Sequence, residues 1–200
     1  MSHARTGSLR GMGKLVITEF ITLDGTIEDP GGAEGLPYGG FAFKFDQGED
    51  GARFKLDELM AADAQLLGRV TYEGFAKAWP AMNDNPFGEK FNAMPKHVVT
   101  STLDDLEWNN SHVVRGDLVA EIAKLKAQYD GDLLLAGSAT LAQSLLELDL
   151  VDQINLMVFP FLAGRGKKLF PQGGPPLSFE LAETAQAGET VTMILRRRKD

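Results

Sequence analysis

The sequence of 200 residues contains no cysteine. Disulfide bonds, thiolate metal ligands and a cysteine nucleophile are therefore excluded. Histidine is scarce as well, and His3, His97 and His112 do not have the spacing of zinc ligands. We therefore expect no bound metal.

Long apolar runs are also missing, since none approaches the ~20 residues needed to cross a bilayer. Residues 1–13 are polar and lack the apolar core of a secretory signal. We expect them to form a flexible arm, with Met12 as an alternative start, ahead of a single domain over residues 14–200. The expected location is the cytoplasm.

Positive charge is in short supply, because 20 lysines and arginines face 28 aspartates and glutamates, for a formal net charge of −8. A general nucleic-acid binder needs a basic surface, so the charge argues against this class. A few local cations still suffice to hold a small anion. We expect a small-molecule ligand, and neither nucleic acid nor membrane as a partner.

The most informative segment joins a short apolar run, residues 64–67, to a predicted helix, residues 72–79. Gly68 lets the backbone approach a ligand closely, Arg69 offers a planar fork for phosphate, and Thr71 can cap the helix. Free N–H groups and the helix dipole favour an anion at such a corner. The segment predicts phosphate binding, although many strand-to-helix turns carry these residues for structural reasons.

A second corner of the same kind follows the leucine-rich run of residues 133–136 and precedes a predicted helix over residues 141–148. It consists of the small residues Gly137, Ser138, Ala139 and Thr140. Small residues let a bulky ligand pass, and Ser138 or Thr140 can cap the helix. A tight turn that needs small residues for packing is the alternative, but two such corners in one domain favour a nucleotide site.

The remaining pattern alternates strands and helices and ends in strands. Strands are predicted over residues 14–23, 64–67, 96–100, 112–114, 133–136 and 153–162, with a closing hairpin over 177–187 and 189–198. Helices are predicted over residues 54–62, 72–79, 87–94, 118–129 and 141–148. This order indicates an α/β domain with a mostly parallel sheet, whose ligand belongs at the carboxyl ends of the strands. The aromatic, glycine-rich stretch of residues 28–51 is either a lid over a ligand or a loop that packs its own satellite core.

Three motifs in a consistent order resemble the dihydrofolate-reductase-like superfamily: residues 22–25, 68–73 and 136–141. The similar branch is the reductase domain of the bifunctional riboflavin-biosynthesis deaminase–reductase, and residues 150–153 and 159–170 match it as well. The resemblance implies a stand-alone NADPH-dependent reductase, often a homodimer. It also implies three α/β/α layers around a mixed, mostly parallel sheet with a C-terminal antiparallel hairpin.

The resemblance also implies roles for the two corners. Gly68, Arg69 and Thr71 would meet the phosphates of NADPH. Thr100 and Ser101 would lie beside the adenosine 2′-phosphate, with Arg69 close enough to neutralise its charge. Gly137, Ser138, Ala139 and Thr140 would hold the pyrophosphate and the nicotinamide side.

Two positions depart from the branch. Thr18 stands where the riboflavin-pathway reductases carry a lysine, and Ala136 stands where they carry a glutamate. Both are contacts expected to recognise the riboflavin intermediate, so we expect a different or broader pterin-, folate- or pyrimidine-like substrate with a C=N or C=O bond.

Asp24, at the end of the first predicted strand, either orients the substrate and relays a proton or serves as a turn residue before Gly25. Three other classes of protein stay open at this point. They are a nucleotide- or folate-binding module without turnover, a flavin-binding protein and a scaffolding protein.

Overall fold

The computed structural model describes residues 12–198 of the chain. The predicted N-terminal arm therefore lies outside the described residues, apart from Met12 and Gly13. The N–H of Gly13 donates to the carbonyl oxygens of Lys126 at 2.9 Å and Tyr129 at 3.0 Å, so the chain is held in place from this residue on.

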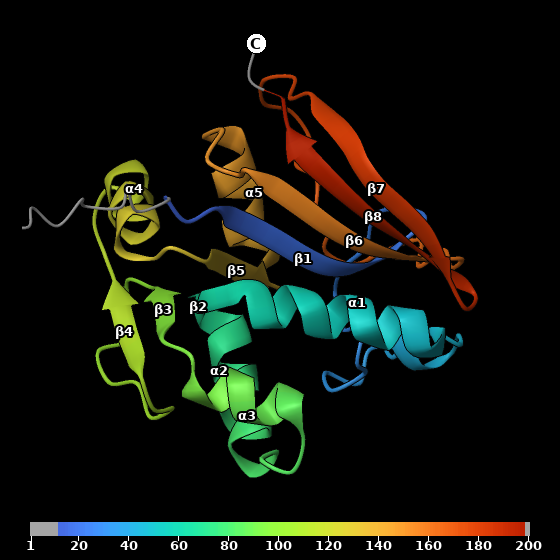
Figure 1. Cartoon of the computed structure of the whole chain (residues 1–200), viewed down its shortest axis with the longest axis horizontal. Helices are drawn as coiled ribbons and strands as arrows, with labels where there is room; N and C mark the ends of the chain where they lie inside the picture. The colour runs from blue at the N-terminus through green and yellow to red at the C-terminus, as the bar shows by residue number, and fades with distance from the viewer. Residues whose placement is uncertain (1–11, 199–200) are drawn as a thin grey trace, which may run out of the picture.

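An eight-stranded sheet forms the centre of the molecule (Figure 1). Its strands are β1 (Leu15–Thr22), β2 (Ala62–Gly68), β3 (Lys96–Val99), β4 (Ser111–Val114), β5 (Asp132–Ala136), β6 (Gln153–Phe159), β7 (Phe179–Ala187) and β8 (Thr190–Arg197). They lie in the order β4-β3-β2-β5-β1-β6-β8-β7. The pairs from β4 to β6 are parallel, and β8 and β7 complete the sheet as an antiparallel hairpin. The predicted mixed, mostly parallel sheet is confirmed.

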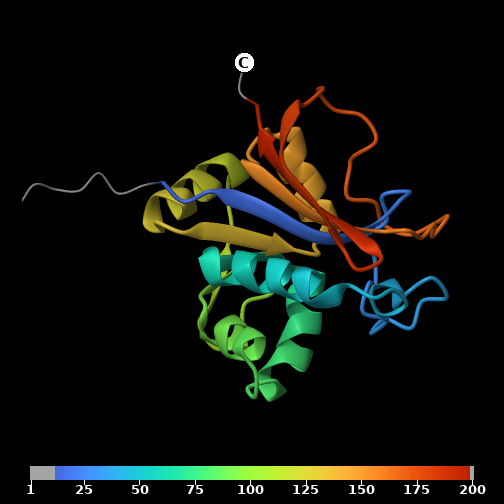
Figure 2. The same cartoon turned by 45° about the vertical axis from the view of Figure 1, so that its right-hand side comes forward.

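Helices cover both faces of the sheet, which gives three layers (Figures 1 and 2). The helices are α1 (Gly48–Ala61), α2 (Arg69–Ala78), α3 (Pro86–Ala93), α4 (Leu118–Gln128) and α5 (Ala139–Glu147), with short 3-10 turns η1 (Phe41–Phe43) and η2 (Trp79–Ala81). Within residues 12–198, no helix is long and apolar enough to cross a membrane.

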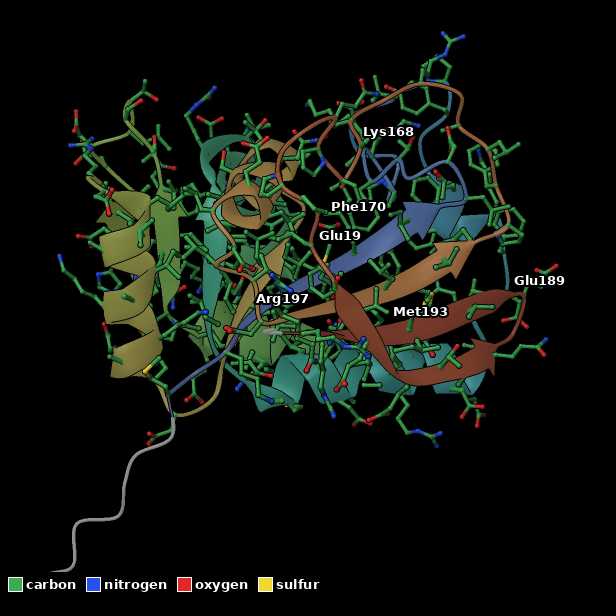
Figure 3. All side chains as sticks on the ribbon, turned by 90° about the horizontal axis from the view of Figure 1, so that it is seen from above. Glu19, Lys168, Phe170, Glu189, Met193 and Arg197 are labelled. Carbon is green, nitrogen blue, oxygen red and sulfur yellow. The ribbon has the colours of Figure 1, made fainter. Side chains whose placement is uncertain are left out.

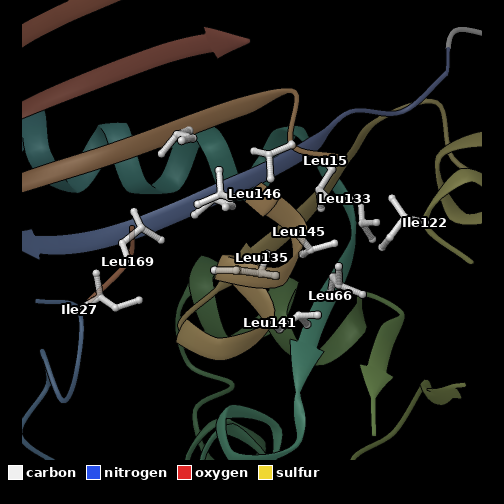
Figure 4. Close-up of a cluster of buried hydrophobic side chains, with 14 of the residues drawn as sticks. Leu15, Ile27, Leu66, Ile122, Leu133, Leu135, Leu141, Leu145, Leu146 and Leu169 are labelled. Carbon is white, nitrogen blue, oxygen red and sulfur yellow. The ribbon is translucent and has the colours of Figure 1, made fainter. Parts of the chain in front are cut away.

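The larger core lies between the sheet and the layer of α4 and α5 (Figure 4). Ile122 from α4 and Leu145 from α5 meet side chains of the central strands, such as Leu135, and all three are fully buried. On the opposite face, Leu59, Tyr72 and Phe91 bring α1, α2 and α3 into a second cluster. Strands buried on both faces explain why their sequences read as continuous apolar runs rather than as alternating patterns.

The main difference from the sequence prediction is the start of α1, which begins at Gly48 instead of residue 54. The Gly48 N–H is held by the Asp46 carboxylate at 2.9 Å, and Glu49 and Asp50 in the first turn suit the positive end of the helix dipole. Because glycine is unfavourable inside helices, Gly48 and Gly51 led the sequence analysis to predict a loop for the first turn of α1. At the other end of the chain, β6 stops at Phe159 because Pro160 cannot donate to the ladder.

The aromatic stretch of residues 28–51 packs a satellite core over the end of β6. Phe41 is fully buried and meets the ring of Phe159 edge-on at 5.4 Å, and the Phe45 ring lies 6.2 Å from Phe159. The packed alternative is therefore confirmed for these two rings. Phe43, in contrast, is 81% exposed.

Candidate functional site

The two glycine-bearing corners lie side by side at the carboxyl edge of the sheet. The strands that precede them, β2 and β5, are parallel neighbours, with Leu66 opposite Leu135. The Gly68 N–H donates to the Ser138 hydroxyl at 2.9 Å, and the Ser138 N–H donates to the Thr71 hydroxyl at 2.9 Å. The corners therefore hold each other directly, by two hydrogen bonds that cross from one to the other.

These bonds overturn the expected capping roles. Thr71 lies inside the first turn of α2, whose N-cap is Gly68, and Ser138 is the N-cap of α5, but its side chain makes no capping bond. Both hydroxyls serve the other corner instead. The first-turn N–H groups of α2 and α5 are consequently left without a side-chain cap, and two such neighbouring helix ends attract an anion.

The backbone at the second corner is unusual at two successive positions. Gly137 has φ +62° and Ser138 has φ +57°, in the left-handed region that favours glycine. A Cβ atom at Gly137 would lie 3.0 Å from Cγ2 of Thr71. Glycine is needed here both for the backbone angle and for the close approach of α2.

The side chains predicted for a 2′-phosphate gather at the neighbouring ends of β2 and β3. Arg69 has a 45% exposed side chain and forms an ion pair with Glu73 at 2.9 Å. Ser101 is exposed just beyond the end of β3, whereas the Thr100 hydroxyl accepts the N–H groups of Thr102 and Leu103, both at 3.2 Å. Thr100 thus stabilises its own turn.

A second cation near this end was missed in the sequence. The Nε of Arg115 donates to the Thr100 carbonyl at 3.3 Å, and its Nη2 pairs with Asp104 at 2.7 Å. Arg115 follows a short strand, β4, whose position beside β3 only the sheet order reveals.

Asp24 is bound into the loop after β6. Its carboxylate accepts hydrogen bonds from the Lys168 ammonium at 2.8 Å, the Thr22 hydroxyl at 2.6 Å, and the N–H groups of Ala163 at 3.1 Å and Gly164 at 2.9 Å. The Lys168 bond, followed by that from Thr22, holds the pKa of Asp24 well below its usual value of 3.8. The group is therefore an anion at neutral pH, which favours the structural alternative over proton donation.

Glu19 is a functional candidate that sequence reasoning did not single out. It lies in the middle of β1, is only 4% exposed, and lies close enough to the backbone of Gly137 for that group to lower its pKa. Burial raises the pKa of Glu19 well above its usual value of 4.5, against a smaller lowering effect of Lys55. Figure 3 shows Glu19 on β1. A lone charged residue inside a strand buried on both faces was the available signal.

A polar cluster on the opposite face of β1 was missed as well. Lys55 of α1 donates to the Thr18 hydroxyl at 2.5 Å and pairs with Glu58 at 2.5 Å. Asn155 of β6 donates to the other oxygen of Glu58 at 3.1 Å. A lysine ammonium thus reaches the Thr18 position from α1, and no local sequence pattern connects residues 37 positions apart.

The three-layer arrangement, with two uncapped helix ends at the carboxyl edge of a mixed sheet, defines a dihydrofolate-reductase-like α/β protein. The chain belongs to the RibD C-terminal domain family, whose sequence profile matches residues 13–193.

Relatives and solved structures agree with this assignment. The uncharacterized protein YyaP of Bacillus subtilis is 25% identical over 191 residues, which cover 91% of this chain and 93% of YyaP. A Shewanella sp. PV-4 protein linked to riboflavin biosynthesis superposes with a TM-score of 0.73 at 21% identity, over 93% of this chain and 99% of that one. Enterococcus faecalis dihydrofolate reductase, solved with NADP(H), gives a TM-score of 0.53 at 17% identity, over 94% and 99%. At these identities the two structures establish the shared fold.

Proposed function

We propose that the protein is an NADPH-dependent reductase acting on a C=N or C=O bond of a small pterin-, folate- or pyrimidine-like heterocycle. The observation that carries this proposal is the direct contact between the two corners, through Ser138, Gly68 and Thr71. NADPH, when bound, supplies a hydride, and the chain binds and orients the two reactants and excludes water.

The residues at the edge of the sheet fit a phosphorylated dinucleotide. The uncapped first turns of α2 and α5, with Ala139 and Thr140 on the latter, provide backbone N–H groups for a pyrophosphate. Arg69 and Ser101 provide a cation and a hydroxyl for a 2′-phosphate. Gly137 lets α2 approach the second corner closely, which keeps the two helix ends together.

The polar cluster of Lys55, Thr18 and Glu58 lies on the other face of β1 from Glu19, and its groups bond one another. It places an ammonium donor and a carboxylate acceptor next to each other, and both side chains are largely shielded from water. The Lys55 ammonium also lies 4.8 Å from the ring centroid of Phe20, so a flat aromatic surface adjoins the polar pair. Because these groups satisfy one another, the cluster fixes α1 against β1 and β6.

Thermal stability tests the cofactor. NADPH at a hundred-fold excess over its dissociation constant raises the unfolding free energy by about 2.7 kcal/mol, and NADH at the same concentration raises it less. Equal shifts would remove the 2′-phosphate role of Arg69 and Ser101, and the absence of any shift would overturn the proposal.

Consumption of NADPH tests the reaction. Dihydrofolate, pterins, the riboflavin intermediate 5-amino-6-(5-phosphoribosylamino)uracil and simple imines form the acceptor panel. NADPH binding without turnover of any acceptor would favour the binding module, and a yellow purified protein would favour the flavin alternative. The homodimer implied by the resemblance stays a prediction, which size-exclusion chromatography with light scattering tests.

A further inference from the structure

Within residues 12–198, Glu19 has a buried carboxyl oxygen without a hydrogen-bond partner, next to Gly137 of the second corner. Its carboxyl lies near the Gly137 backbone, and Oε1 is buried and has no hydrogen-bond partner among the described residues. A buried polar atom without a partner costs free energy, and a buried carboxyl reduces that cost by retaining its proton. Burial thus favours the protonated form of Glu19, and one of its oxygens bonds no described residue.

The other carboxylates near this edge, in the part of the chain that the structure describes, are already engaged. Asp24 accepts four hydrogen bonds from the loop after β6 and from Thr22. Glu58 pairs with Lys55 and accepts from Asn155, and Glu73 pairs with Arg69. Glu19 is left as the acid that combines burial, an unbonded oxygen and contact with a corner.

The order of the strands decides which end of a dinucleotide Glu19 would meet. Arg69 follows β2 and Arg115 follows β4, so these cations lie toward one side of the site. Glu19 lies on β1, beyond β5 from those cations, and neighbouring strands are ~4.8 Å apart. A dinucleotide with its 2′-phosphate at Arg69 and its pyrophosphate at the corners therefore extends its nicotinamide toward β1.

We propose that Glu19 is the proton-exchanging residue at the nicotinamide end of the site, retaining a proton beside the reduced ring and releasing it to solvent beside the oxidised ring. The reduced ring is neutral and the oxidised ring is a cation, so the ionised carboxylate of Glu19 is stabilised only by the oxidised form. The inference rests on the proposed function and deepens it, because it assigns an acid to the same site.

Few charged groups face Glu19 from the elements around it. From α1, Lys55 favours its ionised form and Glu58 opposes it. The first turn of α5 has no acidic residue, β6 has no charged residue, and Lys168 in the segment after β6 is held by Asp24. The charge of a bound ring is therefore the largest new influence on the carboxyl.

Calorimetry with NADP+ and NADPH as separate ligands tests the proposal. Titrations in two buffers of different ionisation enthalpy give the protons exchanged on binding, and the wild type is expected to release about one proton more with NADP+ than with NADPH. Glu19→Gln keeps an oxygen near the Gly137 backbone but carries no acidic proton, so the difference between the ligands should vanish. Asp132→Asn is the matched control. Burial also raises the pKa of Asp132, but this residue lies at the start of β5, at the other end of the strand from the second corner. The control is expected to keep the difference.

Infrared spectroscopy of the wild type gives a second readout that does not depend on a variant folding. The C=O band of a protonated carboxyl should disappear on addition of NADP+ and persist on addition of NADPH. Equal proton exchange with both ligands, or a difference that survives in Glu19→Gln, would overturn this inference and leave the proposed function standing. Failure of the wild type to bind either dinucleotide would overturn both.

Discussion

Ser138 and Gly68 are 70 positions apart in the chain, yet the Ser138 hydroxyl accepts a hydrogen bond from the Gly68 N–H at 2.9 Å. The contact joins the ends of two parallel strands at the points where α2 and α5 begin. The contact holds the two strand-to-helix corners next to each other at the carboxyl end of the sheet. The function proposed for the protein depends on this arrangement.

Removing the Ser138 hydroxyl should loosen this edge. Ser138→Ala leaves the Gly68 N–H without its acceptor, so we expect the unfolding free energy to fall by about 1 kcal/mol and NADPH to bind more weakly. Chemical denaturation and fluorescence titration measure the two effects. Ser144→Ala is the control, since that hydroxyl bonds only the Thr140 carbonyl within α5. An equal loss of NADPH affinity in the control would contradict the role of the contact.

Arg69 should discriminate between the two dinucleotides. Arg69→Ala is expected to weaken NADPH binding about tenfold, through loss of a charge-assisted bond to the 2′-phosphate, and to leave NADH binding nearly unchanged. Dissociation constants for both ligands check this. Arg53→Ala removes a comparable exposed ion pair from α1 and should change neither constant. An unchanged affinity of Arg69→Ala for NADPH would count against the first corner.

The Asp24–Lys168 pair should stabilise the protein at neutral pH and lose its effect in acid. Because the folded state holds the pKa of Asp24 below its usual 3.8, the stabilisation is present above that pH and is lost as the pH falls further. Asp24→Asn should lower the unfolding free energy at pH 7 by about 2 kcal/mol and leave NADPH affinity nearly unchanged.

A double-mutant cycle isolates this pair. Lys168→Met combined with Asp24→Asn should destabilise the protein by less than the sum of the two single changes, since the groups contact each other at 2.8 Å. Strict additivity in urea denaturation would show that the two groups do not act together.

His97 should make the protein sensitive to mild acid. Burial, with a smaller effect of nearby His112, lowers the pKa of His97 from 6.5 to about 4. Below pH 6.5 the unfolded chain binds a proton on this ring, while the native ring stays neutral. The unfolding free energy should therefore fall by about 3 kcal/mol as the pH is lowered from 6.5 to about 4.

Denaturation over this pH range checks the prediction. His97→Gln retains a polar partner for the Tyr129 hydroxyl, which lies 2.7 Å from Nε2 of His97, and should flatten the pH dependence. His112→Gln changes the exposed neighbouring ring and should keep most of it. An equally steep profile in His97→Gln would place the acid sensitivity elsewhere.

Local patterns predicted the elements that depend on local chemistry. The apolar run at β1 and the stripe of Leu118, Ile122 and Leu125 on α4 each match the observed element closely. The start of α1 was placed too late, because Gly48 and Gly51 are atypical of helices and their stabilising contacts, such as those to Asp46 and Gln47, became visible only in the folded chain.

The candidate site was predictable only in part. Gly68, Arg69 and Gly137 stood out because two glycine-bearing strand-to-helix corners occur in one domain. The partners of Ser138 and Thr71 were misread, since a hydroxyl next to a helix start normally caps its own helix, and here each serves the neighbouring corner. Glu19, Lys55 and Arg115 went unnoticed because their importance depends on which strands and helices are neighbours in space.

The sequence alone determined the α/β class, the parallel character of the sheet and the two glycine corners, because these follow from periodicity, turn chemistry and backbone sterics within short segments. Only the tertiary structure decided that β2 and β5 are neighbours, that Asp24 is an engaged anion and that Glu19 is a buried acid. Hydrogen-bond partners and local dielectric depend on what lies nearby in space, and here residues far apart in the chain supply them, such as Gly68 and Ser138 or Asp24 and Lys168.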